Sequence, residues 1–104
     1  MSITSATASE LLAKMNAGEV SSEEITAACL QETARRDDSI NAFLSLQGET
    51  ALETARAVDR KRKPGEPLGK LAGIPVALKD NICAKGATTT CASKMLEAFT
   101  PPYD

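Results

Sequence analysis

The sequence predicts an α/β chain in which helices occupy about residues 1–65 and a strand and loop region follows over residues 66–104. Two hydroxyl-x-x-Glu patterns, each followed by apolar residues at helical spacing, predict the first helices. Residues 74–78 form a largely apolar run with the length of a buried strand, and a loop rich in Gly and Pro leads into it. At 104 residues the chain has the size of one small domain.

The first helix is predicted to begin after Thr7. Thr7 and Glu10 have the spacing of a capping box, in which the Thr oxygen accepts from the amide of Glu10 and the Glu side chain accepts from the amide of Thr7. Leu11 and Met15 follow on one face of this helix, and Gly18 ends it.

The second helix is predicted from Ser21 to about Arg36. Ser21 and Glu24 repeat the capping pattern, and Val20 and Ile25 stand where a hydrophobic staple would clamp the start of the helix. Its apolar residues lie on two nearly opposite sides, which are Ile25, Ala28 and Cys29 on one side and Ala27, Leu30 and Ala34 on the other. We therefore expect this helix to pack against neighbours on two sides.

A short strand over residues 43–46 and a third helix over about residues 49–63 come next. Residues 43–46 are apolar and bounded by polar residues, although the end of a helix would show the same pattern. The third helix carries an apolar stripe that consists of Ala51, Leu52, Ala55 and Val58. Pro64 and Gly65 are predicted to stop it.

The third helix ends in four cations at positions 60–63, and two interpretations compete for them. A nucleic-acid patch is one interpretation, but no aromatic residue is interleaved with these cations. Cations at the C-terminus of a helix also offset the helix macrodipole and need no partner. We therefore interpret residues 60–63 as a solvated helix end.

The last third of the chain is predicted to hold a strand and a few helical turns. Residues 64–73 form the loop that leads into the strand, and Pro75 suits the start of a strand. Residues 93–99 predict one or two helical turns, which Pro101 and Pro102 end.

Composition excludes several classes of function. The chain has 12 Lys and Arg against 14 Asp and Glu, a net charge of -2, so it has no global attraction for nucleic acid or anionic lipid. The absence of His excludes a His-based triad within this chain and removes the commonest metal ligand. Cys29, Cys83 and Cys91 form no C-x-x-C pair, so we expect reduced thiols, no metal and no cofactor. No leader or membrane span is visible, which favours the cytoplasm.

Lys79 is the candidate base. It directly follows the apolar run 74–78 and precedes Asp80 and Asn81. A lysine that its own strand carries into the interior is desolvated, which lowers its pKa toward the range of a general base. The alternative is that Lys79 marks where the strand leaves the core and points its ammonium group at water or at Asp80. Spacing alone favours this alternative.

Cysteine and hydroxyl side chains follow in the next stretch. Cys83 and Cys91 are candidate nucleophiles, with Lys79, Lys85 and Lys94 as the nearby cations, but buried structural thiols are the simpler interpretation. A hydroxyl-rich group consists of Thr88, Thr89, Thr90 and Ser93. These residues line a polar pocket or satisfy backbone groups in a loop, and spacing does not separate the two interpretations.

A known family shares the segment around Lys79. Residues 71–83 have the sequence LAGIPVALKDNIC, and the chain continues with KG at 85–86 and TTCASKML at 89–96. This combination resembles the conserved-lysine region of the amidase signature family. Residues 97–104, EAFTPPYD, and the helical segment 21–33 resemble, more narrowly, the A subunits of the Asp/Glu-tRNA amidotransferases within that family. The resemblance covers nearly all of the chain.

The resemblance implies a catalytic role for Lys79. Enzymes of this family use a Ser, cis-Ser, Lys triad, and Lys79 matches the family's lysine by its place in GIPVALKDN. Its role would be that of a neutral base for the bridging serine, which in turn activates the nucleophilic serine toward an amide. Both serines, the backbone amides that would hold the oxyanion and the glutamine-binding residues lie downstream of residue 104 in the family.

The resemblance also implies a fold and an assembly. Residues 1–104 would be an N-terminal fragment, inactive alone, that holds the helices and first strands of a mixed sheet. The whole subunit would hydrolyse glutamine, and the complex would convert Glu-tRNA(Gln) or Asp-tRNA(Asn) to Gln-tRNA(Gln) or Asn-tRNA(Asn). Subunits B and C would be its partners. ATP and Mg²⁺ would be used by the full complex and no cofactor by this chain.

Two alternatives stay open. One is a stand-alone amidase that acts on a small or fatty amide, and the resemblance of residues 93–97 and 101–104 counts against it. The other is a complete, non-catalytic helical interaction module in which Lys79 is incidental. The aromatic content of 3% and the two-sided second helix count against this module.

Overall fold

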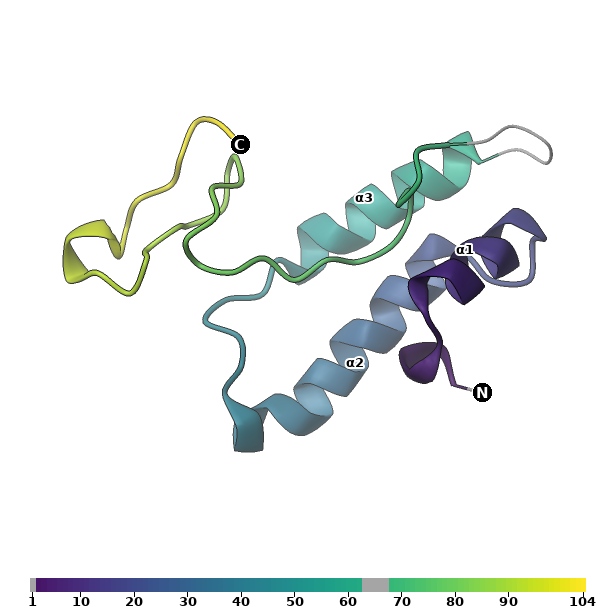
Figure 1. Cartoon of the computed structure of the whole chain (residues 1–104), viewed down its shortest axis with the longest axis horizontal. Coiled ribbons are helices and arrows are strands. Elements are labelled where there is room, and N and C mark those ends of the chain that lie inside the picture. Colours follow the sequence, from purple (N-terminus) through teal and green to yellow (C-terminus); the bar gives the residue numbers. More distant parts are fainter. Residues whose placement is uncertain (1, 63–67) are drawn as a thin grey trace.

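Three α-helices and two 3-10 helices form the regular structure of residues 2–62 and 68–104, which are the residues that this computed structural model describes (Figure 1). In chain order the elements are η1 (Ile3–Ser5), α1 (Ala8–Asn16), α2 (Ser22–Ile40), α3 (Gly48–Lys61) and η2 (Lys94–Leu96). α2 and α3 lie side by side, and residues 80–104 form a separate lobe (Figure 1). Within the described residues no helix is long and apolar enough to cross a membrane.

The capping box and the glycine stop predicted for the first helix are confirmed in α1. The side-chain oxygen of Thr7 accepts from the amide of Glu10 at 3.2 Å, and the Glu10 carboxylate accepts from the amide of Thr7 at 3.1 Å. Gly18 follows the helix at φ +77°, which is a left-handed conformation that favours Gly. The amide of Glu19 then donates to the carbonyl of Lys14 at 2.9 Å and closes the helix end.

α2 begins as predicted but draws on a second helix to satisfy its first turn. The side chain of Ser21 accepts from the amide of Glu24 at 3.1 Å, which is one half of the predicted capping box, and the Glu24 carboxylate makes no return bond to the amide of Ser21. The amides of Ser22 and Glu23 donate to the carboxylate of Asp59, which is on α3, at 2.7 and 3.0 Å. The first turn of α2 is therefore tied to α3 by a carboxylate far away in sequence.

The end of α2 corrects the prediction. The helix runs beyond Arg36 to Ile40 and is capped by Asn41 in a left-handed conformation, with φ 57°. The Asp37 carboxylate accepts from the amides of Ala42 and Phe43, at 2.7 and 3.3 Å. The short polar residues at the end of the helix therefore cap it instead of breaking it.

A small core joins α1 to α2. Its buried members are Leu11, Met15 and Ile25, and Ile25 is 0% exposed. Partly buried residues pack around them, namely Ile3, Ala6, Leu12, Val20, Cys29 and Ile74. The staple position of Val20 is confirmed by this packing. The two neighbours predicted for α2 are η1 and α3, but Ala27 and Ala34 on its second apolar side are exposed.

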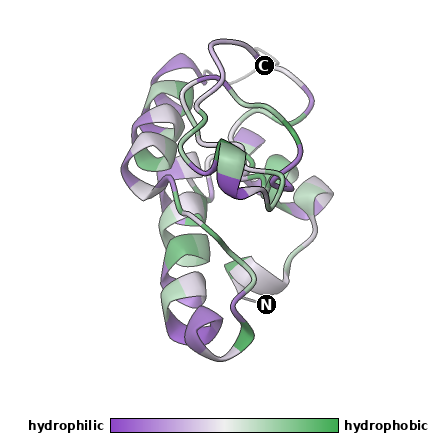
Figure 2. Ribbon diagram, turned by 90° about the vertical axis from the view of Figure 1, so that its left-hand side faces the viewer, coloured by the Kyte–Doolittle hydropathy of each residue, from purple (hydrophilic) through white to green (hydrophobic). Residues whose placement is uncertain are grey.

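Both predicted strands are wrong for the described residues. Residues 43–46 and 74–78 have no strand pairing, and Val76 and Leu78 are 66% and 55% exposed. A strand persists only where a neighbouring strand accepts and donates its hydrogen bonds, and residues 2–62 and 68–104 contain no such neighbour. The described chain is therefore helical and irregular instead of α/β, and Figure 2 shows apolar stretches along its irregular segments as well as its helices.

The remaining boundaries agree with the predictions in part. α3 starts one residue earlier than predicted, at Gly48, and its stripe residue Ala55 is buried. Residues 93–99 contain one 3-10 turn, η2. Lys63, the predicted stop at Pro64 and Gly65, and the predicted boundary at residues 65 and 66 lie outside the described residues.

A junction at one end of the helices holds the chain that follows α3, and we call Ser22, Asp59, Arg62 and Gly73 the helix junction. Ser22 is 1% exposed, and its hydroxyl donates to the carbonyl of Gly73 at 2.8 Å. The Arg62 guanidinium donates to the carbonyl of Ala72 at 2.7 Å. The start of the segment that leads to Lys79 is therefore fixed to both α2 and the end of α3.

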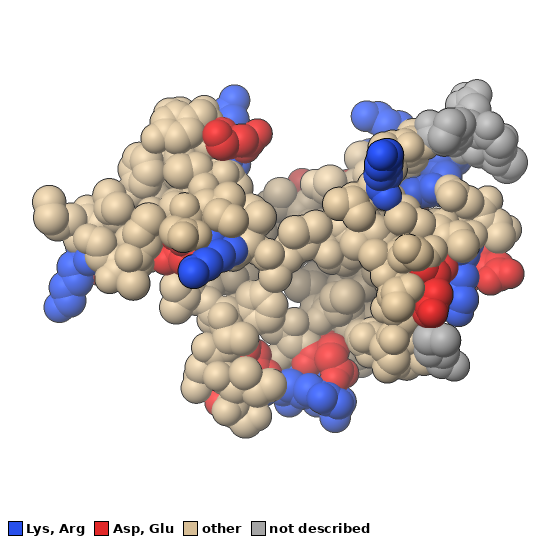
Figure 3. Space-filling model, viewed as in Figure 1, with Lys and Arg blue, Asp and Glu red and all other residues tan. Residues whose placement is uncertain are grey.

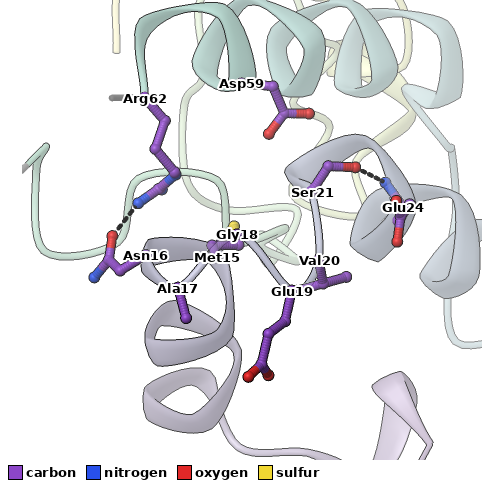
Figure 4. Close-up of a pocket in the computed structure, with 10 residues that line it drawn as sticks. All are labelled: Met15, Asn16, Ala17, Gly18, Glu19, Val20, Ser21, Glu24, Asp59 and Arg62. Atoms are coloured by element: carbon purple, nitrogen blue, oxygen red, sulfur yellow. Dashed lines mark hydrogen bonds between the residues drawn. The ribbon is translucent and has the colours of Figure 1, made fainter. Parts of the chain in front are cut away.

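Arg60 and Lys61 are exposed, as expected of a solvated helix end, and Arg62 is the exception. It is half-buried and also donates to the side chain of Asn16, at the end of α1 (Figure 4). These residues border an open groove of about 370 Å³ between α1 and α3, which Asp59 and Glu24 also line. Arg62 is thus a structural cross-link.

We expect Gly73→Ala to be among the most destabilising small substitutions in this chain. Gly73 lies at φ +91°, and an added Cβ would stand 3.0 Å from the Met15 sulfur and 3.1 Å from the Ser22 side chain. Backbone strain of about 1–2 kcal/mol and overpacking of about 1–3 kcal/mol should together lower the free energy of unfolding by about 2–5 kcal/mol. Urea denaturation followed by circular dichroism measures this change.

Two other glycines serve as matched controls for Gly73. Gly18 has φ +77° but no described atom within 4 Å of an added Cβ, so Gly18→Ala should show the backbone strain alone, about 1–2 kcal/mol. Gly69 has neither feature, so Gly69→Ala should be close to neutral. Equal effects at positions 18 and 73 would contradict the close packing of the helix junction.

Candidate functional site

Lys79, the residue predicted as the base, is exposed in this structure. Residues 76–78 before it are exposed as well, so the expected desolvation of Lys79 is wrong for the described chain. The physical reason is that residues 74–78 have no sheet in which to be buried. The catalytic role of Lys79 therefore stays a prediction that rests on its motif.

The residue after Lys79 is held firmly. The Asp80 carboxylate accepts from the amide of Thr90 at 2.9 Å and from the hydroxyl of the same Thr90. The carbonyl of Asp80 accepts from the amide of Cys91 at 3.0 Å. We call these three bonds the Asp80 clasp. They close the loop between residues 80 and 91 directly beside Lys79.

The clasp sets the charge state of Asp80. The Thr90 hydroxyl, and after it the Thr90 amide, favour the ionised carboxylate and hold the pKa of Asp80 below its usual range. No ion pair joins Lys79 to Asp80, and the structure describes both residues. The alternative in which Lys79 points its ammonium at water or at Asp80 therefore agrees with the exposure of Lys79, and only the pairing with Asp80 is wrong.

In the hydroxyl-rich stretch, the side chains of Thr89 and Thr90 make hydrogen bonds within the loop, which favours the loop interpretation for these two of the four residues. Thr89 is 3% exposed, its hydroxyl donates to the carbonyl of Ile82 at 3.4 Å, and its amide donates to the carbonyl of Phe99 at 3.0 Å. The amide of Gly86 donates to the carbonyl of Pro101 at 3.3 Å. These bonds, together with the fully buried Pro101, tie residues 82–89 to residues 99–101.

The candidate role of Cys83 and Cys91 as nucleophiles stays a prediction, and the structure gives only their state and exposure. All three are free thiols, as predicted. Cys91 is exposed, so the expectation of buried thiols is wrong there, whereas Cys29 and Cys83 are half-buried. Burial raises the pKa of the Cys29 thiol, which keeps it protonated and unreactive.

The charged side chains suggest neither a metal centre nor a basic interface. Among residues 2–62 and 68–104, no group of three or more Cys, Asp or Glu side chains is placed to hold a metal ion. On the face seen in Figure 3, cations and anions are dispersed and mixed in sign. Arg35 and Arg36 pair with Glu32, and Arg56 pairs with Glu23.

The comparison with known families covers both the helices and the Lys79 segment. Residues 24–104 match the family model described as Amidase. The chain belongs to the amidase family. The match contains α2 from its third residue onward, all of α3, the Asp80 clasp and Lys79. In this amidase chain the motif lysine lies between the helix junction and the clasp.

Curated relatives of this amidase chain share one name, which is that of the A subunit of glutamyl-tRNA(Gln) amidotransferase. The chain is 52% identical over 98 residues to the protein of this name from Moorella thermoacetica, which covers 94% of this chain and 20% of that protein. The protein of the same name from Rhodopirellula baltica is 50% identical over 97 residues, covering 93% of this chain and 19% of that protein. The chain thus spans about a fifth of the length of the curated relatives it matches. No solved structure gives a significant match.

Two features of the site were not predicted from the sequence. The sequence indicated Asp80 only as a partner for Lys79, whereas the carboxylate bonds to Thr90, ten residues away. The spacing of a short acid and a hydroxyl residue across a Gly-containing loop was the available signal. The role of Arg62 had no signal, because it depends on how α1 and α3 pack.

The Asp80 clasp should weaken at low pH. Since its hydrogen bonds lower the folded-state pKa of Asp80, its stabilisation is present above the unfolded-state pKa, about 4, and is lost as the pH falls through the lowered pKa. We expect the amides of Thr90 and Cys91 to lose hydrogen-exchange protection, relative to intrinsic rates, between about pH 5 and about pH 2. Protection that stays constant over this range, or that changes equally in Thr90→Val, would contradict the assignment.

Proposed function

We propose that this amidase chain supplies the general base, Lys79, to the glutamine-hydrolysing A subunit of a tRNA-dependent amidotransferase, of which it is the N-terminal portion. The observation that carries the proposal is the 52% identity over 98 residues to a relative that bears the name of such a protein. The motif GIPVALKDN around Lys79 supports the assignment of the base. The position of Lys79 between two anchors, Gly73 and Asp80, supports it further.

The proposed chemistry is amide hydrolysis through a serine. The neutral amine of Lys79 accepts a proton from a bridging serine, whose oxygen accepts the proton of a second serine as that serine attacks the side-chain amide carbon of glutamine. The C–N bond then breaks, ammonia leaves with a returned proton, and water hydrolyses the acyl-enzyme to glutamate. Lys79 is exposed in this chain, and the rest of the amidase domain would have to surround it to exclude water.

The proposed assembly uses this ammonia on a misacylated tRNA. Subunits B and C are the proposed partners, and ATP and Mg²⁺ are used elsewhere in the complex. We assign no residue of this chain to nucleotide, metal or tRNA. The proposed compartment is the cytoplasm.

A chimeric enzyme tests the proposal. Residues 1–104 replace the corresponding fifth of the Moorella thermoacetica relative, and glutamine hydrolysis is measured with and without ATP and Glu-tRNA(Gln). We expect the chimera to be active and Lys79→Ala to lose at least about 100-fold in kcat, because a lost general base raises the barrier of the chemical step. Circular dichroism and gel filtration confirm that the variant folds and assembles.

Lys70→Ala is the matched control, since it removes an exposed lysine from the same part of the chain. Near-normal turnover by Lys79→Ala would contradict the role of Lys79 as base. A chimera that hydrolyses small or fatty amides but amidates no tRNA would instead favour the stand-alone amidase.

A further inference from the structure

The backbone just before Lys79 is weakly held. Upstream of Lys79 the last anchored residues are Gly73, through its bond to Ser22, and Ile74, whose amide donates to the carbonyl of Leu71 at 3.1 Å. Residues 76–78 make no hydrogen bond to another described residue, and they are exposed. A base must stand within hydrogen-bond reach of the group it deprotonates, so a second anchor is needed close to Lys79.

The Asp80 clasp is such an anchor. Asp80 is bonded at three points, through both carboxylate oxygens to Thr90 and through its carbonyl to Cys91. Asp80 directly follows Lys79. A fixed Asp80 therefore also fixes the peptide group that joins the two residues. The three bonds together also resist rotation about the Asp80 backbone, which one bond alone would not.

The other side of the clasp is itself well anchored. The Thr90 hydroxyl, besides donating to Asp80, accepts from the amide of Ala92 at 3.2 Å. The preceding Thr89 is buried and bonded to the carbonyl of Phe99. Cys91 and Ala92 adopt left-handed conformations, with φ 51° and 59°, which non-glycine residues rarely adopt and which persist where their surroundings hold them. Asp80 is therefore tied to a defined part of the lobe.

We propose that Asp80 and Thr90 are positioning residues for Lys79. The bonds of Asp80 to residues 90 and 91 hold the Lys79 backbone in place relative to the other groups of an amidase site. The inference rests on the proposed function of Lys79 as base. It adds a requirement that the motif alone does not contain, which is a hydroxyl group at position 90. Valine has nearly the shape of threonine without this hydroxyl, and serine keeps it.

Kinetics of the chimeric enzyme test the positioning role. We expect Thr90→Val to lower kcat by about 10- to 100-fold, because a base displaced by about 1 Å loses alignment. KM for glutamine should stay within about twofold, because the clasp does not touch the substrate. Thr90→Ser should stay within about threefold of the parent in kcat, and Glu97→Gln, which changes an exposed carboxylate of the same lobe, should leave kcat unchanged. Rates are expressed per folded enzyme.

The 104-residue chain tests the clasp without any activity. We expect Thr90→Val to increase hydrogen exchange at the Cys91 amide by at least about fivefold, and Thr90→Ser to restore protection. Unchanged exchange in Thr90→Val would overturn the clasp, and equal losses of kcat in Thr90→Val and Thr90→Ser would overturn the need for the hydroxyl.

The outcomes separate this inference from the proposed function. An inactive Lys79→Ala together with a fully active Thr90→Val would overturn the positioning role and leave Lys79 as the base. An active Lys79→Ala would overturn the proposed function and the positioning role with it.

Discussion

The Asp59 carboxylate is the interaction on which the helical part of this chain depends. Asp59 lies near the end of α3, and its carboxylate accepts hydrogen bonds from two amides at the start of α2. One side chain therefore caps the N-terminus of α2 and joins α2 to α3. Ser22, held by this contact, is then oriented to donate to the carbonyl of Gly73. Gly73 in turn packs so closely on Met15 and Ser22 that both side chains would have to shift to admit a Cβ at this position. The chain that leads to Lys79 therefore starts from a fixed point.

The segment that leads to Lys79, in contrast to the helix junction, makes few contacts. Between Gly73 and Asp80 the chain exposes apolar residues and has no pairing partner among the described residues. Unpaired apolar backbone of this kind is typical of a segment that can pair with another chain segment. The curated relatives that the chain matches are about five times longer than the chain. The Asp80 clasp fixes the end of this segment at Asp80, and the bond of Gly73 to Ser22 fixes its start.

Short sequence patterns correctly predicted the features that depend on residues close together in the sequence. The capping box of Thr7 and the stop at Gly18 involve neighbours within a few residues, and the motif around Lys79 indicated the family. Contacts between distant residues were not predictable in this way. Asp59 reaches Ser22 across most of the helical region, and Arg62 reaches Asn16 only because α1 and α3 converge. The strand over residues 74–78 was predicted from its apolar run, but strand formation depends on a partner that a single segment does not encode.

Residue-resolved hydrogen exchange on the 104-residue chain, shown to be monomeric, tests the central claim most directly. The account predicts a steep gradient of protection, because the junction is closed by buried bonds and the Lys79 segment is not. The amides of Ser22 and Glu23 should exchange slowly, and those of Val76, Ala77 and Leu78 should exchange at rates close to those of an unfolded peptide. Slow exchange across residues 76–78, or rapid exchange at Ser22 and Glu23, would contradict it.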